Sequence, residues 1–472
     1  MSHHQPGTDT EPRSGEGSPL SPNKSVTLTI DGIPVTVPEG TRILEAAKKV
    51  NVNIPTLCEH PDLCKRALCR ICVVEADGRG KLIAACANDV WEGVNIVTTN
   101  QRLLNIRKTI IELILANHPQ DCLSCIRSKK CELQSLALVF GVGGSLFDND
   151  AEERQPQIES ETLVRNMDKC VKCGRCVEVC QEVQTIRAIN TSHRSHEYEI
   201  STPYKQALKD GPCVFCGKCA AVCPVGAIYE HDQTAEVRAV LAAGQKAIAQ
   251  ISPNLAAAVN DELALAANTI TAGKLVTAIK LLGFDKVYDA AITANAVNSE
   301  IAGEVQQRKN GGLLPVVSGC SAGIANFVKN FYPDLADHLT AVKGLRRYFA
   351  SSLKSGYAKE AGLDSSSVTS VFFVPCIAQK YGAGAKDETD FALIAGELVR
   401  MLKLAGIVIE GLPEESFDSV NIDLPKQDTS VKKETVHGFA QARKVMEAIR
   451  EGKCGAEWVE ILNCPGDKCI YL

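Results

Sequence analysis

The sequence predicts a modular protein of the α+β and α/β classes, with small cysteine-rich modules followed by a truncated α/β domain. Three features predict this organisation. Cysteines crowd the first 224 residues and are sparse afterwards. Residues 25–36, SVTLTIDGIPVT, alternate apolar and polar side chains around Asp31-Gly32, which is typical of a β-hairpin. From about residue 231, apolar strand-like runs alternate with amphipathic helical patterns, which favours an open α/β layer.

Composition excludes several classes of function. The chain carries 51 Lys and Arg against 56 Asp and Glu, with no basic stripe, so nucleic acid is not expected as a partner. No apolar run reaches the roughly 18 residues that a membrane span requires. Residues 1–24 are polar and rich in Gly, Pro and Ser. We therefore expect a disordered lead without the apolar core of a signal peptide, and a cytoplasmic protein.

The 21 cysteines are the most informative residues. Disulfide-rich chains are usually short and secreted, whereas this chain has 472 residues and no export signal. Most of the cysteines stand in Cys-x-x-Cys groups, and this spacing favours metal ligation in a reducing cytoplasm over disulfides.

Residues 25–100 are predicted to form a β-grasp ferredoxin domain, because the hairpin is followed by a helical pattern over residues 41–52, with Thr41 as N-cap, and then by a cysteine loop. Four thiolates are what a [2Fe–2S] cluster requires. The C-x10-C-x2-C-x13-C spacing resembles the variant found in the complex I large iron–sulfur subunit and in iron-only hydrogenases. Cys64 is interpreted as a spare thiol. The predicted ligands are Cys58, Cys69, Cys72 and Cys86.

Residues 101–160 contain an H-x3-C-x2-C-x5-C motif. One histidine with three cysteines also suits tetrahedral zinc. The position between other iron–sulfur motifs favours a [4Fe–4S] cluster, and the spacing resembles the histidine-ligated cluster of the same two families. A neutral imidazole in place of a thiolate makes such a cluster less negative, which favours its reduction. The predicted ligands are His118, Cys122, Cys125 and Cys131.

Residues 161–230 contain two copies of C-x2-C-x2-C-x3-C. In bacterial two-cluster ferredoxins, which have this pattern, the fourth cysteine of each copy ligates the other cluster. We therefore predict one [4Fe–4S] cluster on Cys170, Cys173, Cys176 and Cys223, and another on Cys180, Cys213, Cys216 and Cys219. No acid, base or nucleophile stands out in the first 230 residues, so this half is interpreted as an electron relay of one [2Fe–2S] and three [4Fe–4S] clusters.

Residues 231–472 resemble iron-only ([FeFe]) hydrogenases, and the resemblance extends over nearly the whole chain. Three stretches resemble the active-site motifs of that family, in this order: VVSGCSAGIANFVKNFYPDLADHL (316–339), FFVPCIAQKYGA (372–383) and HGFAQARKVMEAIREGKCGAEWVEILNCPGDKC (437–469). In that family, cysteines of these motifs hold a [4Fe–4S] cubane, and one of them bridges to a di-iron centre with CO and cyanide.

The first and third motifs depart from the family pattern. Where the family has a proton-donor cysteine followed by a ligand cysteine, this chain has Cys320 and Ser321. A hydroxyl is a poor iron–sulfur ligand. Cys464 and Cys469 stand one residue further apart than the family's pair. One residue displaces a thiol by up to ~3.5 Å, which exceeds a metal–sulfur bond of about 2.3 Å.

The second motif keeps Cys376 and Lys380, whereas Gln379 replaces a lysine and Gly382 a glutamate. The family also has a long segment, between the positions of residues 408 and 437, that lines the di-iron pocket, and a glycine-rich segment after the last ligand. Here residues 409–436 are polar and loop-like, and the chain ends soon after its last cysteine. We therefore expect no di-iron centre.

Two interpretations of the remaining thiols stay open. They hold a further, degenerate [4Fe–4S] cluster, or they are buried free thiols of a packed α/β domain. Cys454 stands in a charged stretch and is interpreted as incidental. The thiols concerned are Cys320, Cys376, Cys464 and Cys469.

The resemblance implies an electron-transfer subunit of a hetero-oligomeric, flavin-dependent and electron-bifurcating NAD(P)/ferredoxin oxidoreductase. The sequence is most similar to the branch of Stn-type transhydrogenases, whose hydrogenase-like subunit lacks the hydrogen-reacting site. The implied partners are a flavin- and NAD(P)-binding subunit resembling that of complex I, a small thioredoxin-like [2Fe–2S] subunit, and ferredoxin. Because the chain has no G-x-G-x-x-G or Walker motif, FMN or FAD and NAD(P) are expected on the partners.

Three other functions receive less support from the sequence. A catalytic subunit of an NAD(P)-linked [FeFe] hydrogenase is the main alternative, and it requires Ser321 to be tolerated. A redox sensor lacks support, because no kinase, PAS or DNA-binding module is attached. A complex I subunit would share the N-terminal clusters but not the hydrogenase-like half.

Overall fold

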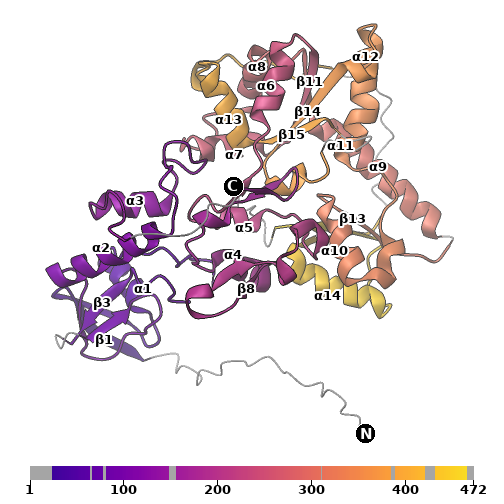
Figure 1. Ribbon diagram of the computed structural model, residues 1–472. Coiled ribbons are helices and arrows are strands. Elements are labelled where there is room, and N and C mark those ends of the chain that lie inside the picture. Colours follow the sequence, from indigo (N-terminus) through magenta and orange to yellow (C-terminus); the bar gives the residue numbers. More distant parts are fainter. Residues whose placement is uncertain are drawn as a thin grey trace, which may run out of the picture. The chain divides into compact units, whose positions relative to one another are not determined.

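The computed structural model of the protein divides into two compact units (Figure 1). Unit 1 comprises residues 1–59, 65–116 and 133–148, and unit 2 comprises residues 60–64, 117–132 and 149–472. Almost all of the predicted lead over residues 1–24, together with Cys64 and Cys469, lies outside the described residues. No helix in the described part of the chain is long and apolar enough to span a membrane. The structure describes residues 24–63, 66–77, 81–147, 156–309, 311–383, 389–419 and 431–464.

Unit 1 is built on a five-stranded sheet in the order β2-β1-β5-β3-β4. The predicted hairpin is confirmed: β1 and β2 are antiparallel, and Gly32 takes a φ of 81° in the turn. β5 runs parallel to β1 and antiparallel to β3, and β4 is antiparallel to β3. The elements are β1 (Ser25–Ile30), β2 (Ile33–Pro38), α1 (Ile43–Lys49), β3 (Val73–Ala76), β4 (Lys81–Ala84), β5 (Asn95–Val97), α2 (Gln101–Ala116) and α3 (Glu132–Val139).

Helix α1 packs its apolar face on this sheet, where Ile43 and Leu44 join Val26, Leu28 and Ile30 in one core. The predicted N-cap was wrong. The helix begins at Ile43 after Arg42, and the Thr41 hydroxyl instead donates to the Pro38 carbonyl at 2.7 Å. A local hydrogen bond to the preceding turn thus competes with the helix for this side chain.

Short elements frame the cysteine runs of unit 2. A three-stranded antiparallel sheet has the order β10-β7-β6, and β8 pairs with β9 in a separate antiparallel hairpin. A short helix follows the second cysteine of each run. The elements are β6 (Gln157–Ile158), β7 (Leu163–Arg165), α4 (Arg175–Glu178), the π-helical turn η2 (Val179–Val183), β8 (Asn190–Ser192), β9 (Glu199–Ser201), α5 (Lys218–Ala221) and β10 (Ile228–Glu230).

The predicted α/β layering of unit 2 takes the form of two parallel sheets. The first has the order β12-β11-β14-β15. It lies between α6, α7, α8 and α13 on one face and the η7–α12 region on the other (Figure 1). Its elements are α6 (Thr234–Ala242), β11 (Lys246–Ile251), α7 (Leu255–Glu262), α8 (Ala272–Leu281), β12 (Lys286–Asp289), η7 (Phe349–Lys354), α12 (Ser355–Glu360), β14 (Val368–Val374), β15 (Phe391–Ile394) and α13 (Ala395–Leu404).

The second parallel sheet has the order β13-β17-β16. Its core is continuous with that of the cysteine-rich part of unit 2, because Val214 and Phe215 join Ile324, Phe327 and Val459 in one apolar cluster. The elements around this sheet are α9 (Ala290–Lys309), β13 (Val316–Gly319), α10 (Gly323–Phe331), α11 (Leu345–Tyr348), β16 (Lys433–His437), α14 (Gly438–Arg450) and β17 (Trp458–Leu462).

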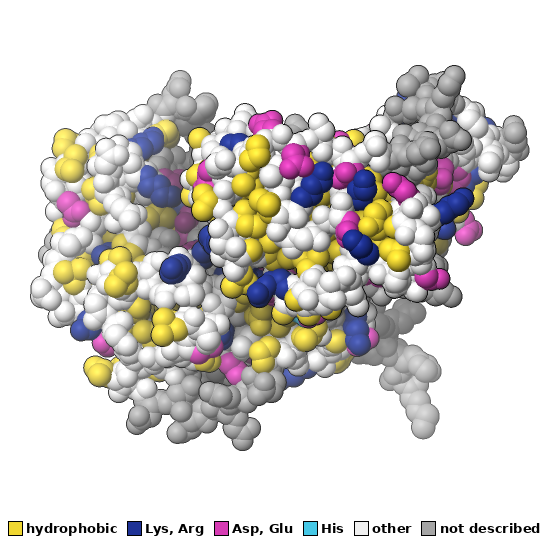
Figure 2. Space-filling model, turned by 90° about the horizontal axis from the view of Figure 1, so that it is seen from above, with side chains coloured by type: hydrophobic (Ala, Val, Ile, Leu, Met, Phe, Trp, Pro, Cys, Tyr) yellow, Lys and Arg dark blue, Asp and Glu magenta, His cyan; other side chains and the backbone are white. Residues whose placement is uncertain are grey.

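Surface charges of both signs are mixed. On the face drawn in Figure 2, lysine and arginine side chains lie among aspartates and glutamates rather than in one continuous area. With 51 basic and 56 acidic residues in the chain, long-range steering of a charged partner depends on local groups of one sign.

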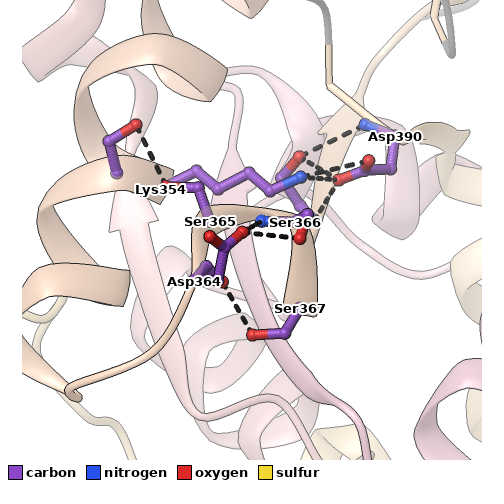
Figure 3. A network of polar contacts seen from close by, with 8 residues as sticks. Lys354, Asp364, Ser365, Ser366, Ser367 and Asp390 are labelled. Atoms are coloured by element: carbon purple, nitrogen blue, oxygen red, sulfur yellow. Dashed lines mark hydrogen bonds and ion pairs between the residues drawn. The ribbon is translucent and has the colours of Figure 1, made fainter.

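A polar network fixes the register of β14, the strand that leads to Cys376 (Figure 3). Asp390 accepts from the backbone and hydroxyl of Ser370 at 2.7 and 2.6 Å and from the Lys354 ammonium at 2.8 Å. Asp364 accepts from the Ser366 amide at 2.7 Å, which closes the turn before β14. The start of β14 is therefore tied to η7 and to the residue just before β15.

A fully buried ion pair joins the second predicted motif to α13. The Lys380 ammonium donates to both oxygens of Glu397, at 2.7 and 2.8 Å, and to the His231 carbonyl at 2.7 Å. Glu397 also accepts from the Gln233 and Ile394 amides at 2.8 Å. Burial raises the pKa of Glu397, and Lys380 opposes this shift. Such pairs are costly to break by removing one partner.

We predict that Lys380→Met destabilises the protein by about 3–5 kcal/mol, because it leaves the Glu397 carboxylate buried and unpaired. The apparent free energy of unfolding of the holoprotein in urea, followed by circular dichroism, measures the effect. Lys453→Met, which breaks the exposed pair with Glu451, is the matched control and should cost at most about 1 kcal/mol. Equal losses for the two variants would contradict the assignment.

Candidate iron–sulfur centres

The structure brings together the four cysteines predicted in unit 1. The Cys72 and Cys86 sulfurs are 3.3 Å apart, and the Cys69 amide lies 3.5 Å from the Cys58 sulfur. The Cys58 thiol also contacts those of Cys69 and Cys86. Residues far apart in sequence therefore converge on one largely buried point.

Arg107 holds the cysteine loop from α2. Its buried guanidinium donates to the carbonyls of Ile71 and Val73, at 3.2 and 2.7 Å, on either side of Cys72. Ala67 and Arg70 take φ values of 52° and 62° around Cys69, a region that non-glycine residues seldom occupy. The loop is thus held in a conformation that turns its thiols toward one centre. Sequence reasoning did not single out Arg107.

Hydrogen bonds among these four thiols lower the pKa of two of them and raise the pKa of the other two. Hydrogen bonding from Cys69 lowers the pKa of Cys58 to about 2, and hydrogen bonding from Cys86 lowers that of Cys72 to about 7. The same contact with Cys58 raises the pKa of Cys69 and of Cys86. Sulfurs that compete for protons at this distance fit iron, which would take the place of those protons.

His118 presents a ring nitrogen without a protein partner. Its Nδ1 is buried and makes no hydrogen bond to any described residue. Burial, followed by the charge of Lys169, lowers the pKa of the imidazole, so the neutral, metal-binding form is favoured. Gly226 leaves room for the Cys125 sulfur. A Cβ at position 226 would lie only 2.9 Å from this sulfur, closer than real Cβ contacts.

The segment carrying this histidine is attached to the twin cysteine runs. Lys169 bonds Asp121 at 2.7 Å and also faces the Cys125 thiol. Asp121 begins the turn that contains Cys122, since the Ser124 amide donates to its carbonyl at 3.1 Å. Glu132, next to buried Cys131, forms a bidentate pair with Arg175 at 2.6 and 2.8 Å. The predicted histidine site therefore adjoins the run that contains Cys176.

The two cysteine runs repeat the same backbone geometry. Lys172 and Phe215 occupy equivalent positions, with φ values of 53° and 50°, and each amide donates to the sulfur two residues earlier, at 3.4 Å. The glycines after the second cysteines, Gly174 and Gly217, have φ values of 78° and 73°. Backbone amides directed at sulfur stabilise negative charge there.

Cysteines from both runs line each of two apolar cavities. One cavity contains Cys170, Cys173, Cys176 and Cys223, and the other contains Cys180, Cys213, Cys216 and Cys219. Burial raises the pKa of these thiols, to about 11 for Cys170 and Cys180 and to about 12 for Cys173. A buried thiolate needs a nearby positive charge, which the iron of a cluster would supply.

Each cavity also has a buried cation at the same place in the repeat. Arg175 and Lys218 each precede the third cysteine and are 5% and 1% exposed. The Lys218 charge acts on Cys216 and opposes the effect of burial on its pKa. Buried cations at equivalent positions suit an anionic thiolate cluster in each cavity.

Cys223→Ser should remove the same cluster as Cys173→Ser, because both side chains line one cavity. Cys180→Ser should instead match Cys213→Ser. Iron and acid-labile sulfide content, with electron paramagnetic resonance spectra of the reduced proteins, identify which cluster is lost. A spectrum of Cys223→Ser that matches Cys213→Ser would contradict the crossed pairing.

The described residues include three of the four thiols of the candidate site in the C-terminal half. The backbone amide of Asn463 donates to the Cys320 sulfur at 3.4 Å. Cys464 lies close enough for its charge to raise the pKa of Cys216. Cys376 is buried just after β14, and Cys469 lies outside the described residues. Among the described residues, Asn463 thus brings Cys464 close to Cys320, while Cys376 lies just after β14.

Two polar side chains that sequence reasoning missed, those of Asn463 and Arg346, lie in this region. The buried side-chain amide of Asn463 donates to the Ser321 hydroxyl at 2.8 Å. Arg346 donates to the carbonyls of Gln379 and Tyr381, both at 2.5 Å. A Cβ on Gly382, whose φ is 91°, would lie 2.9 Å from the Arg346 guanidinium. A longer side chain at position 382 would therefore meet Arg346.

Gln184 connects this region to the nearest cysteine cavity. Its amide donates to the Asn463 carbonyl at 3.1 Å and also contacts the Cys216 sulfur, and it is only 1% exposed. Gln184 follows the π-helical turn η2, which no sequence pattern had indicated. Hydrogen bonds to cluster sulfurs stabilise the reduced, more negative form of a cluster.

We predict that Gln184→Leu lowers the midpoint potential of one [4Fe–4S] cluster and leaves the others unchanged, because the amide donor near Cys216 is lost. Redox titration followed by electron paramagnetic resonance measures this shift. Gln250→Leu is the matched control. Gln250 is also buried, but it lies in β11 and donates to Thr293 of α9 at 2.8 Å. An unchanged potential in Gln184→Leu, or the same shift in both variants, would contradict the role of Gln184.

Four family models match the chain. They are the 2Fe-2S iron-sulfur cluster binding domain (residues 23–101), the NADH-ubiquinone oxidoreductase-G iron-sulfur binding region (107–145), the ferredoxin-like domain of NADH-quinone oxidoreductase subunit 3 (160–229) and the C-terminal domain of the iron only hydrogenase large subunit (245–426).

Two curated relatives match over most of the chain, and a third matches over less than half of it. The NADP-reducing hydrogenase subunit HndD of Solidesulfovibrio fructosivorans is 35% identical over 414 residues, 84% of this chain and 71% of that protein. Iron hydrogenase 1 of Clostridium pasteurianum is 30% identical and covers 83% of this chain and 70% of that protein. The NADPH-Fe(3+) oxidoreductase subunit alpha of Geobacter sulfurreducens is 34% identical over 43% of this chain and 24% of that protein.

Among solved structures, a chain of an NAD+-reducing [NiFe]-hydrogenase in the H2-reduced state aligns with a TM-score of 0.41. It is 30% identical, and the alignment covers 44% of this chain and 88% of that chain.

The grouped cysteines and these matches define an iron–sulfur oxidoreductase subunit. More specifically, the chain belongs to the iron-only hydrogenase large-subunit family, as a hydrogenase-like large subunit with 2Fe-2S and NADH dehydrogenase-type 4Fe-4S domains. The family resemblance inferred from the sequence is confirmed.

Proposed function

We propose that the chain is the iron–sulfur electron-transfer subunit of a multi-subunit, flavin-dependent and electron-bifurcating NAD(P)/ferredoxin oxidoreductase of the transhydrogenase type. It would act as a relay without a hydrogen-reacting site of its own. A β-grasp domain would hold one [2Fe–2S] cluster on Cys58, Cys69, Cys72 and Cys86. Three [4Fe–4S] clusters would be held by the histidine-containing group and the two crossed groups of cysteines. Bound clusters supply one-electron transfer, and the protein residues hold and insulate them.

One observation carries the absence of a hydrogen-reacting site. Ser321 stands where the resemblance expects a ligand cysteine, and its hydroxyl accepts the Asn463 amide at 2.8 Å. A hydroxyl is a harder ligand than a thiolate, and this one is already engaged in a hydrogen bond, so it is a poor ligand for iron. The serine is therefore part of a polar contact, which supports a protein-filled site over a metal-binding one.

The second motif supports the same conclusion. The retained Lys380 points into the ion pair with Glu397 and is fully buried there. Gly382 replaces the expected glutamate and leaves room for Arg346, which is 8% exposed. The charged groups of this motif thus hold the fold together instead of lining a reaction pocket.

Contacts within unit 2 support a continuous electron path. The Glu132–Arg175 pair links the histidine-containing segment to the first cavity. Cys176 and Cys219 of the two cavities lie near enough for their charges to interact. Gln184 then links the second cavity to Asn463. Three candidate clusters would therefore follow one another through protein with few exposed groups.

The names of relatives support pyridine-nucleotide partners. One relative is an NADP-reducing hydrogenase subunit and another is an NADPH-Fe(3+) oxidoreductase subunit. Because the chain has no nucleotide-binding motif, we infer that FMN or FAD and NAD(P) bind on a flavin subunit resembling that of complex I. A small thioredoxin-like [2Fe–2S] subunit and ferredoxin would complete the proposed assembly.

The second candidate function is the catalytic subunit of an NAD(P)-linked [FeFe] hydrogenase. Cys320 and Cys376 are retained at their motif positions, and Cys464 follows Asn463, whose amide contacts the Cys320 sulfur. These thiols, with Cys469, would be the ligands of a degenerate [4Fe–4S] cluster. The Ser321–Asn463 contact favours the relay over this alternative.

We expect that the chain, co-expressed with the hydrogenase maturation proteins and purified without oxygen, has no infrared bands from CO or cyanide. The reason is that Ser321 and Arg346 leave no complete site for a di-iron centre. Iron content should be accounted for by [2Fe–2S] and [4Fe–4S] clusters alone. An [FeFe] hydrogenase matured in parallel is the positive control, and CO and cyanide bands in this chain would make it a hydrogenase.

A further inference from the structure

The two cysteine cavities of unit 2 are related by an internal repeat but differ in what covers them. In the second cysteine run, which is covered, Phe215 stacks on Tyr381 with ring centroids 4.3 Å apart. A Cβ on Gly323 would lie 2.1 Å from the Val214 carbonyl, so the hydrogenase-like domain lies directly against this cysteine run. Nothing as large as a partner protein can reach the second cavity from this side.

Lys172 occupies the position equivalent to Phe215, with nearly the same φ, and its surroundings are open. It lines a cavity of about 510 Å³ that also exposes Cys170 and Met167. The β8–β9 hairpin and its flanks form the opposite wall, through His193, Glu197 and Lys205 among others. The first candidate cluster is therefore accessible where the second is sealed.

The lining of this opening carries three cationic side chains, Arg165, Lys172 and Lys205, against two carboxylates, Glu197 and Glu199. Arg165, with a side chain 9% exposed, lines the cavity and has Glu159 at 3.3 Å as its ion-pair partner. The Lys172 side chain is exposed at this cavity. Lys205 lies 2.9 Å from Glu199, and His193 lies 3.7 Å from the same carboxylate. The chain as a whole has a net charge of −5, which makes a cationic opening a local feature.

The rim offers apolar contacts as well. Tyr204, next to Lys205 in sequence, is 99% exposed, and Ile158, beside Gln157 of the cavity wall, is 66% exposed. β6 is an edge strand of its sheet. A few exposed apolar side chains within a charged rim are typical of transient electron-transfer interfaces.

We propose that this cavity is the docking site at which an acidic electron-carrier protein of the ferredoxin class exchanges electrons with the cluster on Cys170, Cys173, Cys176 and Cys223. The inference rests on the proposed relay function. A carboxylate of the carrier would enter between Arg165 and Lys172. One electron would pass from the reduced carrier to this cluster, so that the carrier is oxidised as the cluster is reduced, and no bond forms or breaks.

The test is the second-order rate constant for reduction of the holoprotein by a photoreduced acidic ferredoxin, followed by stopped-flow absorbance. Lys172→Glu and Lys205→Glu should each lower the rate by about tenfold or more at low ionic strength, and added salt should narrow the difference. Lys209→Glu is the matched control, because Lys209 is an exposed lysine of the same module that does not line the cavity. It should leave the rate close to that of the unaltered protein.

Two further measurements separate the outcomes. Iron content and reduction by dithionite show whether each variant keeps its clusters. Reduced methyl viologen, a cation, should react no more slowly with Lys172→Glu. If both variants react with ferredoxin as fast as Lys209→Glu, the docking site is wrong while the relay stands. If the unaltered protein is reduced by dithionite but not by ferredoxin, the ferredoxin-linked function itself fails, and the docking site with it.

Discussion

The burial of thiols and cations around shared centres is the constraint on which the rest of unit 2 depends. Cys223 lies in one cavity with Cys170, Cys173 and Cys176, although about two thirds of the module or more separates them in sequence. Arg175 and Lys218 are buried at equivalent places beside these sulfurs. Burying a charge is costly unless a compensating charge lies nearby, a role that Glu132 has for Arg175 and that thiolate clusters would add for both cations. The small sheets around them serve mainly to hold the ends of these loops.

The hydrogenase-like domain has a structural part in this arrangement. Its apolar core is continuous with that of the cysteine runs, and Gly323 lies directly against the Val214 carbonyl. Such a domain excludes water from the second cavity whether or not it binds metal itself. Exclusion of water and hydrogen bonding to sulfur both act on cluster potential, so a domain without catalysis can still tune electron transfer. The contacts of Gln184 with Asn463 and Cys216 are the place where this tuning would occur.

The changes in the three motifs belong together in space. Asn463 donates to Ser321, and Arg346 lies against Gly382 and bonds the carbonyl of Gln379. Each departure read from the sequence alone is a single lost ligand or lost charge. In the structure, the replacements contact one another or fill the space that a larger side chain would need. A metal bound at this site would have to displace these contacts, which opposes its binding.

The sequence by itself determined the cysteine groups, the hairpin at residues 25–36 and the family, because ligand spacing and side-chain alternation are local properties. It misplaced the cap of α1, where a bond from Thr41 to Pro38 competed with capping. Only the tertiary structure decided that Arg107 holds the loop around Cys72, that Gln184 reaches Cys216, and that Lys172 is open where Phe215 is covered. These outcomes depend on contacts between segments far apart in the chain, which no local pattern encodes.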